Sequence, residues 1–105
     1  MMKEKQIMGV VKNPKKPAYV DALIENTLEN LQGMVRGYIE TVTLGGFTVI
    51  CNEEGRINKM PFNCVINGVD FYGPILIVDR AGDEFCSLTF KKAQYVRDKI
   101  NEVYG

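Results

Sequence analysis

Histidine is absent from the 105 residues of this chain. Its absence removes the usual general base near neutral pH, every Ser-His or Cys-His nucleophile arrangement and most zinc sites. The three cysteines, Cys51, Cys64 and Cys86, form no Cys-x-x-Cys pair, so their spacing supports neither a dithiol redox pair nor a local metal site. We therefore expect a protein that binds something rather than an enzyme, with no cofactor and no metal.

Net charge and long apolar runs are lacking as well. Thirteen basic side chains balance thirteen acidic ones, so no global field draws the chain onto phosphate backbones, and non-specific nucleic-acid binding is disfavoured. The same balance leaves little repulsion between copies, which makes a homo-oligomer easier to form. No apolar run approaches the roughly 20 residues that span a bilayer. The start of the chain leads into no signal-peptide stretch, so we expect a cytoplasmic protein with no membrane partner.

Recognisable catalytic and phosphate motifs are also missing. The chain has neither a P-loop nor a Gly-x-Gly-x-x-Gly turn. Glu53-Glu54 and Asp83-Glu84 are adjacent acidic pairs, but adjacent side chains usually point apart, and both pairs occupy predicted turns. We interpret these acids as solvated surface residues, although an enzyme built on carboxylates and lysines stays an alternative.

The overall composition is that of one globular domain, residues 1–105. Hydrophobic residues make up 46% and charged residues 25% of the chain, as in ordinary folded domains. The order of apolar patterns predicts an α+β fold with a mostly antiparallel sheet of about five strands. A short helix is expected after the second strand, and a C-terminal amphipathic helix is expected to pack on the sheet.

Two hairpins are predicted in the first half of the chain. Residues 7–11 and 18–24 have strand-like composition on either side of a turn with two prolines. Residues 38–44 and 47–51 are β-branched and aromatic runs separated by Gly45-Gly46, a pair that tolerates the positive φ of a two-residue turn.

Two helices are predicted from their caps and apolar periodicity. The first begins with Asn26 and Glu29 as a capping box and ends at Gly37 as the left-handed residue. The second begins after Ser87 or Thr89 as its cap. The apolar faces expected to be buried are Leu28, Leu31, Met34 and Val35 in the first helix and Phe90, Ala93, Val96, Ile100 and Val103 in the second.

The centre of the sheet is predicted in the second half of the chain. Residues 75–78 are a continuous apolar run, typical of a strand buried on both faces, and follow the interruption Gly73-Pro74. Residues 58–68 are irregular, and Pro61 argues against a regular central element there.

The segment 52–63 is the strongest candidate for a ligand site, because it combines cations, amides and an aromatic residue in a loop-like context. Arg and Lys suit phosphate, Asn suits base edges, and Phe suits stacking. The competing interpretation is structural: the Asn side chains cap turns, Met60 and Phe62 fill the core, and the cations are solvated. The candidate ligand residues of this segment are Asn52, Arg56, Asn58, Lys59 and Asn63.

Arg36 and Tyr38 form a second candidate, since a basic residue at a helix end beside an aromatic residue can line a pocket or an interface. Their structural interpretation is that Arg36 complements the dipole of the helix C-terminus and that Tyr38 is a half-buried strand residue.

Four ordered motifs carry a resemblance that covers nearly the whole chain. They are Asn26-Thr27-Leu28-Glu29-Asn30-Leu31-Gln32, Gly37-Tyr38-Ile39-Glu40, Cys51-Asn52-Glu53-Glu54-Gly55-Arg56-Ile57-Asn58 and Glu84-Phe85-Cys86-Ser87-Leu88-Thr89. With these motifs the chain resembles a small domain-of-unknown-function family encoded by phages, prophages and conjugative elements of Gram-positive bacteria. It departs from the Leu-Pro-x-Asn core of that family at Met60-Pro61-Phe62-Asn63.

This resemblance implies a setting, an accessory gene of a mobile element acting in the cytoplasm of the bacterial host. Such proteins are often counter-defence factors, and we expect a sponge that sequesters a cyclic or ADP-ribose-type nucleotide of host immunity. The alternative is a protein-binding inhibitor of a host nuclease or restriction enzyme, of the anti-CRISPR or antirestriction type. Zero net charge argues against an inhibitor that mimics DNA, because such proteins are usually strongly acidic. The sponge is therefore the favoured hypothesis.

Overall fold

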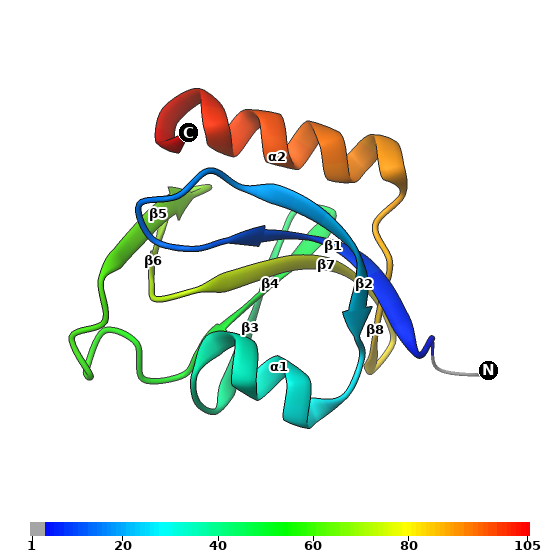
Figure 1. Ribbon diagram of the computed structural model, residues 1–105, viewed down its shortest axis with the longest axis horizontal. Helices are drawn as coiled ribbons and strands as arrows, with labels where there is room; N and C mark the ends of the chain where they lie inside the picture. Colours follow the sequence, from blue (N-terminus) through cyan, green and yellow to red (C-terminus); the bar gives the residue numbers. More distant parts are fainter. Residues whose placement is uncertain (1–3) are drawn as a thin grey trace.

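An antiparallel sheet forms the body of the computed structural model, which describes residues 4–105 (Figure 1). Its main path has the order β2-β1-β7-β4-β3, and β8 pairs with β7 as a sixth strand. A separate two-stranded sheet is formed by β5 and β6. The prediction of a mostly antiparallel sheet is confirmed, but five strands were too few. The strands are β1 (Gln6–Lys12), β2 (Tyr19–Glu25), β3 (Ile39–Leu44), β4 (Phe47–Asn52), β5 (Phe62–Ile66), β6 (Val69–Tyr72), β7 (Ile75–Ala81) and β8 (Glu84–Cys86).

Strand β7 lies at the centre of the sheet, as its apolar run predicts. Ile77 pairs with Val10 of β1 on one side and with Val49 of β4 on the other. All four residues of the run 75–78 are buried. Both predicted hairpins are present, and the two-residue turn between β3 and β4 places Gly45 and Gly46 at positive φ.

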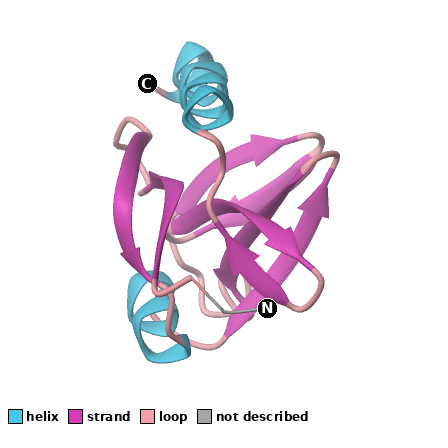
Figure 2. Cartoon of the chain, turned by 90° about the vertical axis from the view of Figure 1, so that its right-hand side faces the viewer, coloured by secondary structure: helices cyan, strands magenta, loops and turns pink. Residues whose placement is uncertain are grey.

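Two helices cover opposite faces of the sheet (Figure 2). Helix α2 (Phe90–Tyr104) lies over one face, where the core also receives side chains from the β5–β6 hairpin. Helix α1 (Leu28–Val35) covers the other face, and its Leu31 and Val35 join a second apolar cluster there. The C-terminal end of α2 lies above the β5–β6 hairpin and near the β1–β2 turn (Figure 1). Segments far apart in the sequence therefore meet at this end of the molecule.

The N-cap of α1 is Thr27, not Asn26 as the capping-box pattern predicts. Thr27 Oγ1 accepts a hydrogen bond from the backbone N–H of Asn30 at 3.1 Å. Asn26 is buried, and its Nδ2 donates to the carbonyl oxygens of Glu4 at 3.0 Å and Phe85 at 3.1 Å. Asn26 thus joins the two flanking segments instead of starting the helix.

The C-terminal end and the apolar face of α1 also differ from prediction. Arg36, with φ 64°, is the left-handed residue that ends the helix, in place of Gly37. Leu28 is 58% exposed, because the buried contacts of α1 come from Leu31 and Val35 further along the helix.

Helix α2 begins at the expected cap, since Thr89 Oγ1 accepts from the backbone N–H of Lys92 at 3.1 Å. Its buried face consists of Ala93, Val96 and Ile100. Phe90 and Val103 are exposed, contrary to prediction, because they lie on opposite borders of the arc that those three residues define. Tyr104 instead packs against the core at the last turn.

Strand β5 and the turn of the β5–β6 hairpin occupy residues that the sequence pattern left irregular. Its turn is Asn67-Gly68, with φ values of 49° and 81°, and Asn-Gly is a strong signal for a two-residue hairpin turn. Pro61 lies just before β5, where it removes no ladder hydrogen bond. The register pairs Phe62 with Tyr72.

Candidate ligand-binding site

Arg36 and Tyr38 are both exposed where α1 ends and β3 begins, and Asn52 lies beneath them. Asn52 is buried, and its Nδ2 donates to the carbonyl oxygens of Val35 at 3.0 Å and Arg36 at 3.1 Å. Its Oδ1 accepts from the backbone N–H of Glu54 at 2.8 Å. The amide of Asn52 is therefore occupied by the backbone.

Arg56, Asn58 and Lys59 lie on an exposed run of turns after β4. Gly55 lets this run approach β6, because a Cβ atom there would lie 2.8 Å from the carbonyl oxygen of Tyr72. Arg56 therefore lies over the Tyr72 ring, with its guanidinium carbon 5.1 Å from the ring centroid. Of the three predicted residues, Arg56 borders a pocket.

That pocket is acidic, which the sequence pattern did not indicate. It holds about 180 Å³, and we call it the acidic pocket. Three carboxylates, those of Glu40, Glu53 and Asp70, line it together with the single cation Arg56. Arg56 Nη2 lies 3.4 Å from Asp70 Oδ2. A phosphate group is poorly suited to this place, because three negative side chains surround one cation that already has a partner.

Asn63 lies apart from the other predicted residues, at the end of the sheet near the β1–β2 turn. It is buried, and its Nδ2 donates to the carbonyl oxygens of Lys12 and Gly73, both at 2.8 Å. Its Oδ1 has no hydrogen-bond partner among residues 4–105. A buried acceptor without a partner is uncommon and often marks a place where water or a ligand binds.

Asn63 lines a cleft of about 390 Å³, which we call the lysine cleft. Its volume lies in the range of small-molecule sites. Two cations and two aromatic rings give it its chemistry, and in the part of the chain that the structure describes no acidic residue lines it. The lining residues are Lys12, Lys15, Pro61, Phe62, Asn63 and Tyr104.

Lys12 is the least expected member of the cleft, because the residue is only 1% exposed. Its Nζ donates to the carbonyl oxygen of Asn13 at 2.9 Å and lies 6.0 Å from the Tyr104 ring centroid. An ammonium group can donate three hydrogen bonds. Burial lowers the pKa of Lys12, against a smaller effect of Cys64 that raises it. The ammonium is thus poorly solvated. An anion beside it would stabilise the positive charge in place of the water that burial removes.

The last turn of α2 is held firmly against the cleft. Tyr104 Oη accepts from the backbone N–H of Val65 at 3.0 Å. One turn earlier, the amide of Asn101 accepts from the N–H of Ala18 at 2.8 Å and donates to its carbonyl oxygen at 3.0 Å. These contacts fix the Tyr104 ring between β1 and β5 before any ligand arrives.

The aromatic rings continue beyond the cleft as a row that we call the aromatic strip, formed by Tyr104, Phe62 and Tyr72. The ring centroids are 6.4 Å apart between Phe62 and Tyr104 and 5.6 Å apart between Phe62 and Tyr72, and both pairs meet edge to face. Lys12 lies at one end of the strip and Arg56 at the other. Phe62, at the centre, is 44% exposed. A planar ligand would therefore find exposed aromatic surface between two cations.

Sequence reasoning missed Lys12, Lys15, Tyr72 and Tyr104. Lys12 is the last residue of β1 and Lys15 lies in the turn that follows it, whereas the sequence pattern assigned both to a connecting turn. The Asn67-Gly68 turn could have revealed that Phe62 and Tyr72 face each other. Nothing in the sequence could have shown that Tyr104 reaches them.

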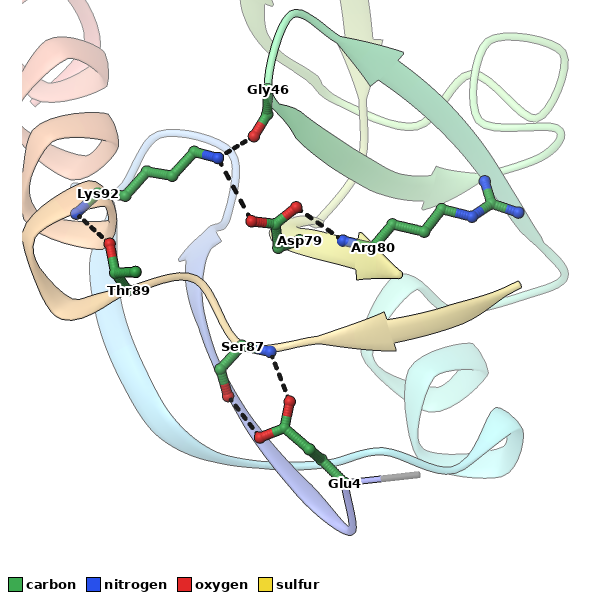
Figure 3. A network of polar contacts seen from close by, with 7 residues as sticks. All are labelled: Glu4, Gly46, Asp79, Arg80, Ser87, Thr89 and Lys92. Carbon is green, nitrogen blue, oxygen red and sulfur yellow. Dashed lines mark hydrogen bonds and ion pairs between the residues drawn. The ribbon is translucent and has the colours of Figure 1, made fainter. Parts of the chain in front are cut away.

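A polar network at the other end of α2 provides a contrast (Figure 3). Lys92 Nζ donates to the carbonyl oxygen of Gly46 and lies 3.4 Å from Asp79 Oδ2. The backbone N–H and the Oγ of Ser87 donate to the two carboxylate oxygens of Glu4, at 3.1 Å and 3.3 Å. Each charged group here has a partner within the chain, so the network ties α2 to the sheet.

The fold and the cleft define a small α+β domain built on an antiparallel sheet, with a ligand-sized cleft at one end. Among the described residues, no group of three or more Cys, Asp and Glu side chains is placed to hold a metal ion. No helix in residues 4–105 has the length and apolar character needed to cross a membrane.

The chain belongs to the family described as "Domain of unknown function (DUF3846)", whose model matches residues 7–101. This match confirms the resemblance to a domain-of-unknown-function family. No curated protein and no solved structure matches the chain.

Proposed function

We propose that this protein binds a nucleotide-type ligand in the lysine cleft without transforming it. The observation that carries the proposal is a buried ammonium group, Lys12, beside exposed aromatic surface in a cleft lined by no acidic residue in the described part of the chain. A buried cation normally costs stability unless it is paired. An anionic ligand would supply the missing partner.

The parts of a nucleotide match the parts of the cleft. Lys12 and Lys15 suit a phosphate group, and the rings of Phe62 and Tyr104 suit a base. The orphaned Oδ1 of Asn63 suits a hydroxyl or amino group, delivered directly or through a water molecule. Lys15 has a φ of 63°, so the turn presents this cation in a left-handed backbone conformation that few non-glycine residues adopt.

In the biological setting that we propose, a phage or another mobile element encodes the protein. Tight binding without turnover would then sequester a cyclic or ADP-ribose-type nucleotide that signals host immunity. The cleft supports this proposal because it offers binding groups without a histidine or another recognisable catalytic group.

A protein-binding inhibitor is the second candidate, and one observation favours it. Phe90, Tyr95 and Val103 are large, apolar and exposed on α2. Exposed apolar residues on one helix can contact a partner protein. Retention of one host nuclease or restriction enzyme from a lysate, lost when Tyr95 is changed to Ser, would support this function.

The test of the nucleotide proposal is thermal unfolding of the purified protein against linear and cyclic nucleotides and ADP-ribose. A ligand at 100 times its dissociation constant adds about 2.7 kcal/mol of stability. For a domain of this size that raises the unfolding midpoint by on the order of 10 °C. A midpoint that no nucleotide shifts would contradict the proposal.

Two adjacent lysines offer a matched pair of variants for the same scan. Lys15 lines the cleft, whereas Lys16 is exposed and does not. Lys15→Gln should reduce the ligand-induced shift, and Lys16→Gln should leave it unchanged. Equal effects of the two variants would mean that only general electrostatic attraction is involved.

A further inference from the structure

The aromatic strip joins two places of opposite character. At one end, the lysine cleft holds Lys12 and Lys15 and no acidic lining residue within the described chain. At the other end, the acidic pocket holds three carboxylates around Arg56. A ligand that lies along the strip therefore meets cations at one end and a mixture of acceptors and one donor group at the other.

Arg56 and Asp70 form the part of the acidic pocket that touches the strip. Arg56 lies over Tyr72, and its Nη2 contacts Asp70 Oδ2 at 3.4 Å, a long contact for an ion pair. Both side chains are accessible, at 69% and 45% exposure. Because the guanidinium has five donor hydrogens and a carboxylate accepts about four hydrogen bonds, most of this capacity is free for a ligand.

A donor group beside an acceptor group, at the edge of an aromatic ring, complements the edge of an aminopurine. The exocyclic amino group of adenine or guanine can donate to a carboxylate, and a neighbouring ring nitrogen or carbonyl oxygen can accept from arginine. Phe62, whose exposed ring meets Tyr72 edge to face, supplies the surface on which such a base stacks. Phosphate would be repelled here by Glu40, Glu53 and Asp70.

The rings of the strip connect the two cations. From Lys12 Nζ to the Arg56 guanidinium carbon, four successive steps of 6.0, 6.4, 5.6 and 5.1 Å pass over three rings, and together they set an upper limit on the separation of the two groups. A nucleotide whose base is separated from its terminal anionic group by further phosphates reaches further along this path than a nucleoside monophosphate does.

We propose that Arg56 and Asp70 form a base subsite for a purine with an exocyclic amino group, and that the ligand extends along the aromatic strip to place its phosphates at Lys12 and Lys15. This inference rests on the proposed function of the lysine cleft. It adds the chemical class of the base and the orientation of the ligand.

The test is calorimetric titration of the whole chain with ATP, GTP, ITP and AMP in the presence of EDTA. ATP or GTP should bind about tenfold more tightly than ITP, which lacks the amino group. Whichever of the two binds more tightly identifies adenine or guanine as the base. AMP should bind more weakly than ATP, because its single phosphate offers Lys12 and Lys15 less negative charge than a triphosphate does.

Substitutions at Asp70 and Arg56 test whether these two residues cause the preference for a base with an exocyclic amino group. Asp70→Asn should bring the affinity for the preferred nucleotide down to that for ITP, and Arg56→Lys should have a similar effect, because lysine lacks the planar fork of donors. Asp83→Asn, in the exposed turn between β7 and β8, is the matched control and should change nothing. Circular dichroism of each variant would verify the fold.

The outcomes separate the inference from the proposed function. Equal affinities for ATP, GTP and ITP, unchanged in Asp70→Asn but lost in Lys15→Gln, would overturn the base subsite and leave the lysine cleft as a nucleotide site. AMP binding as tightly as ATP would overturn the extended pose. Absence of binding by these four nucleotides, together with a midpoint shift from a cyclic nucleotide or ADP-ribose, would overturn the base subsite and leave the lysine cleft as a nucleotide site. If the cyclic nucleotides and ADP-ribose also leave the midpoint unchanged, both proposals are overturned.

Discussion

At the scale of single residues, Lys12 shows how stability and binding would oppose each other. Its ammonium is buried and makes one hydrogen bond within the described chain, to a carbonyl oxygen that also accepts from the N–H of Lys16 at 3.2 Å. Removing the charge therefore leaves that oxygen with a partner. Such a residue contributes little to folding, so a substitution that removes its charge can test the binding role that we propose for it.

Lys12→Met should separate these two roles. Methionine has a similar length and no charge, so we expect the free energy of unfolding to rise by about 1 kcal/mol. Nucleotide affinity should fall by at least about tenfold, because a charge-assisted contact to phosphate is lost. Urea unfolding and calorimetric titration measure the two effects. Lys91→Met, on the exposed side of α2, is the control, and a destabilised Lys12→Met with normal binding would contradict this role.

Asn52 and Asn58 offer a second contrast between residues that the sequence pattern grouped together. Asn52→Ala removes three hydrogen bonds to backbone groups, one of them buried, and should destabilise the fold by about 2 to 3 kcal/mol. Asn58→Ala, in an exposed turn, should stay within about 0.5 kcal/mol of the parent. Urea midpoints at equal m values would measure both. Equal effects would contradict a structural role for Asn52.

The candidate site could be predicted only in part, for a physical reason that particular residues make clear. Residue type pointed to the segment that contains Arg56, Phe62 and Asn63, but type does not reveal which cations face carboxylates. Asp70, which is the partner of Arg56, comes fourteen positions later, on β6. Lys12 was overlooked because a lysine in a turn is usually solvated, and only the completed fold buries it.

At the scale of elements, two glycines in regular structure have opposite roles. In β1, a Cβ atom at Gly9 would lie 2.7 Å from the carbonyl oxygen of Ile77 and 3.0 Å from Val78 Cγ1. In α1, a Cβ atom at Gly33 would meet nothing within 4 Å. Gly9 thus permits the close approach of β1 and β7, whereas Gly33 only weakens its helix.

Alanine at each position tests this difference. Gly9→Ala should lower the free energy of unfolding by about 2 kcal/mol, because backbone at the sheet centre cannot move aside cheaply. Gly33→Ala should raise it by about 0.5 to 1 kcal/mol through helix propensity. Thermal unfolding of both variants in one buffer would measure the pair. A neutral Gly9→Ala would show that β1 can shift away from β7.

Most elements were predictable because their signals are local. The Gly45-Gly46 turn and the apolar run 75–78 each fix an element without help from the rest of the chain. Errors arose where two local signals compete. Asn26 is a better cap by type than Thr27, but its side chain is drawn to the backbone of Glu4 and Phe85, which only the folded chain brings close.

At the scale of the whole molecule, the buried residue Cys64 links the lysine cleft to the core. Cys64 is buried on β5, next to Asn63, and Lys12 and Cys64 each influence the pKa of the other. Burial raises the pKa of the Cys64 thiol to about 11, against the opposing effect of Lys12. Burial also raises the pKa of Cys51 to about 11, and the carboxylate of Glu40 adds to this rise.

These shifts predict that the protein loses stability as the pH rises above 9. In the unfolded chain both thiols ionise near their ordinary pKa of 9.0, and in the fold they stay protonated to about 11. Their stabilising contribution is therefore complete below pH 9 and is lost as the pH rises towards 11. Each thiol should remove about 1.4 kcal/mol of stability per pH unit within this window.

Lys12 has the opposite effect on the pH dependence of stability and therefore provides the control. Its pKa is lowered in the fold, so the cost of burying its charge is relieved as the pH rises towards the ordinary value of 10.5. Urea unfolding between pH 8 and 10.5 should therefore show a steeper loss of stability in Lys12→Met than in the parent. Cys64→Ala should show a shallower loss, because the contribution of Cys64 is then removed. Identical slopes in the parent and Cys64→Ala would mean that the fold does not protect the Cys64 thiol from ionisation.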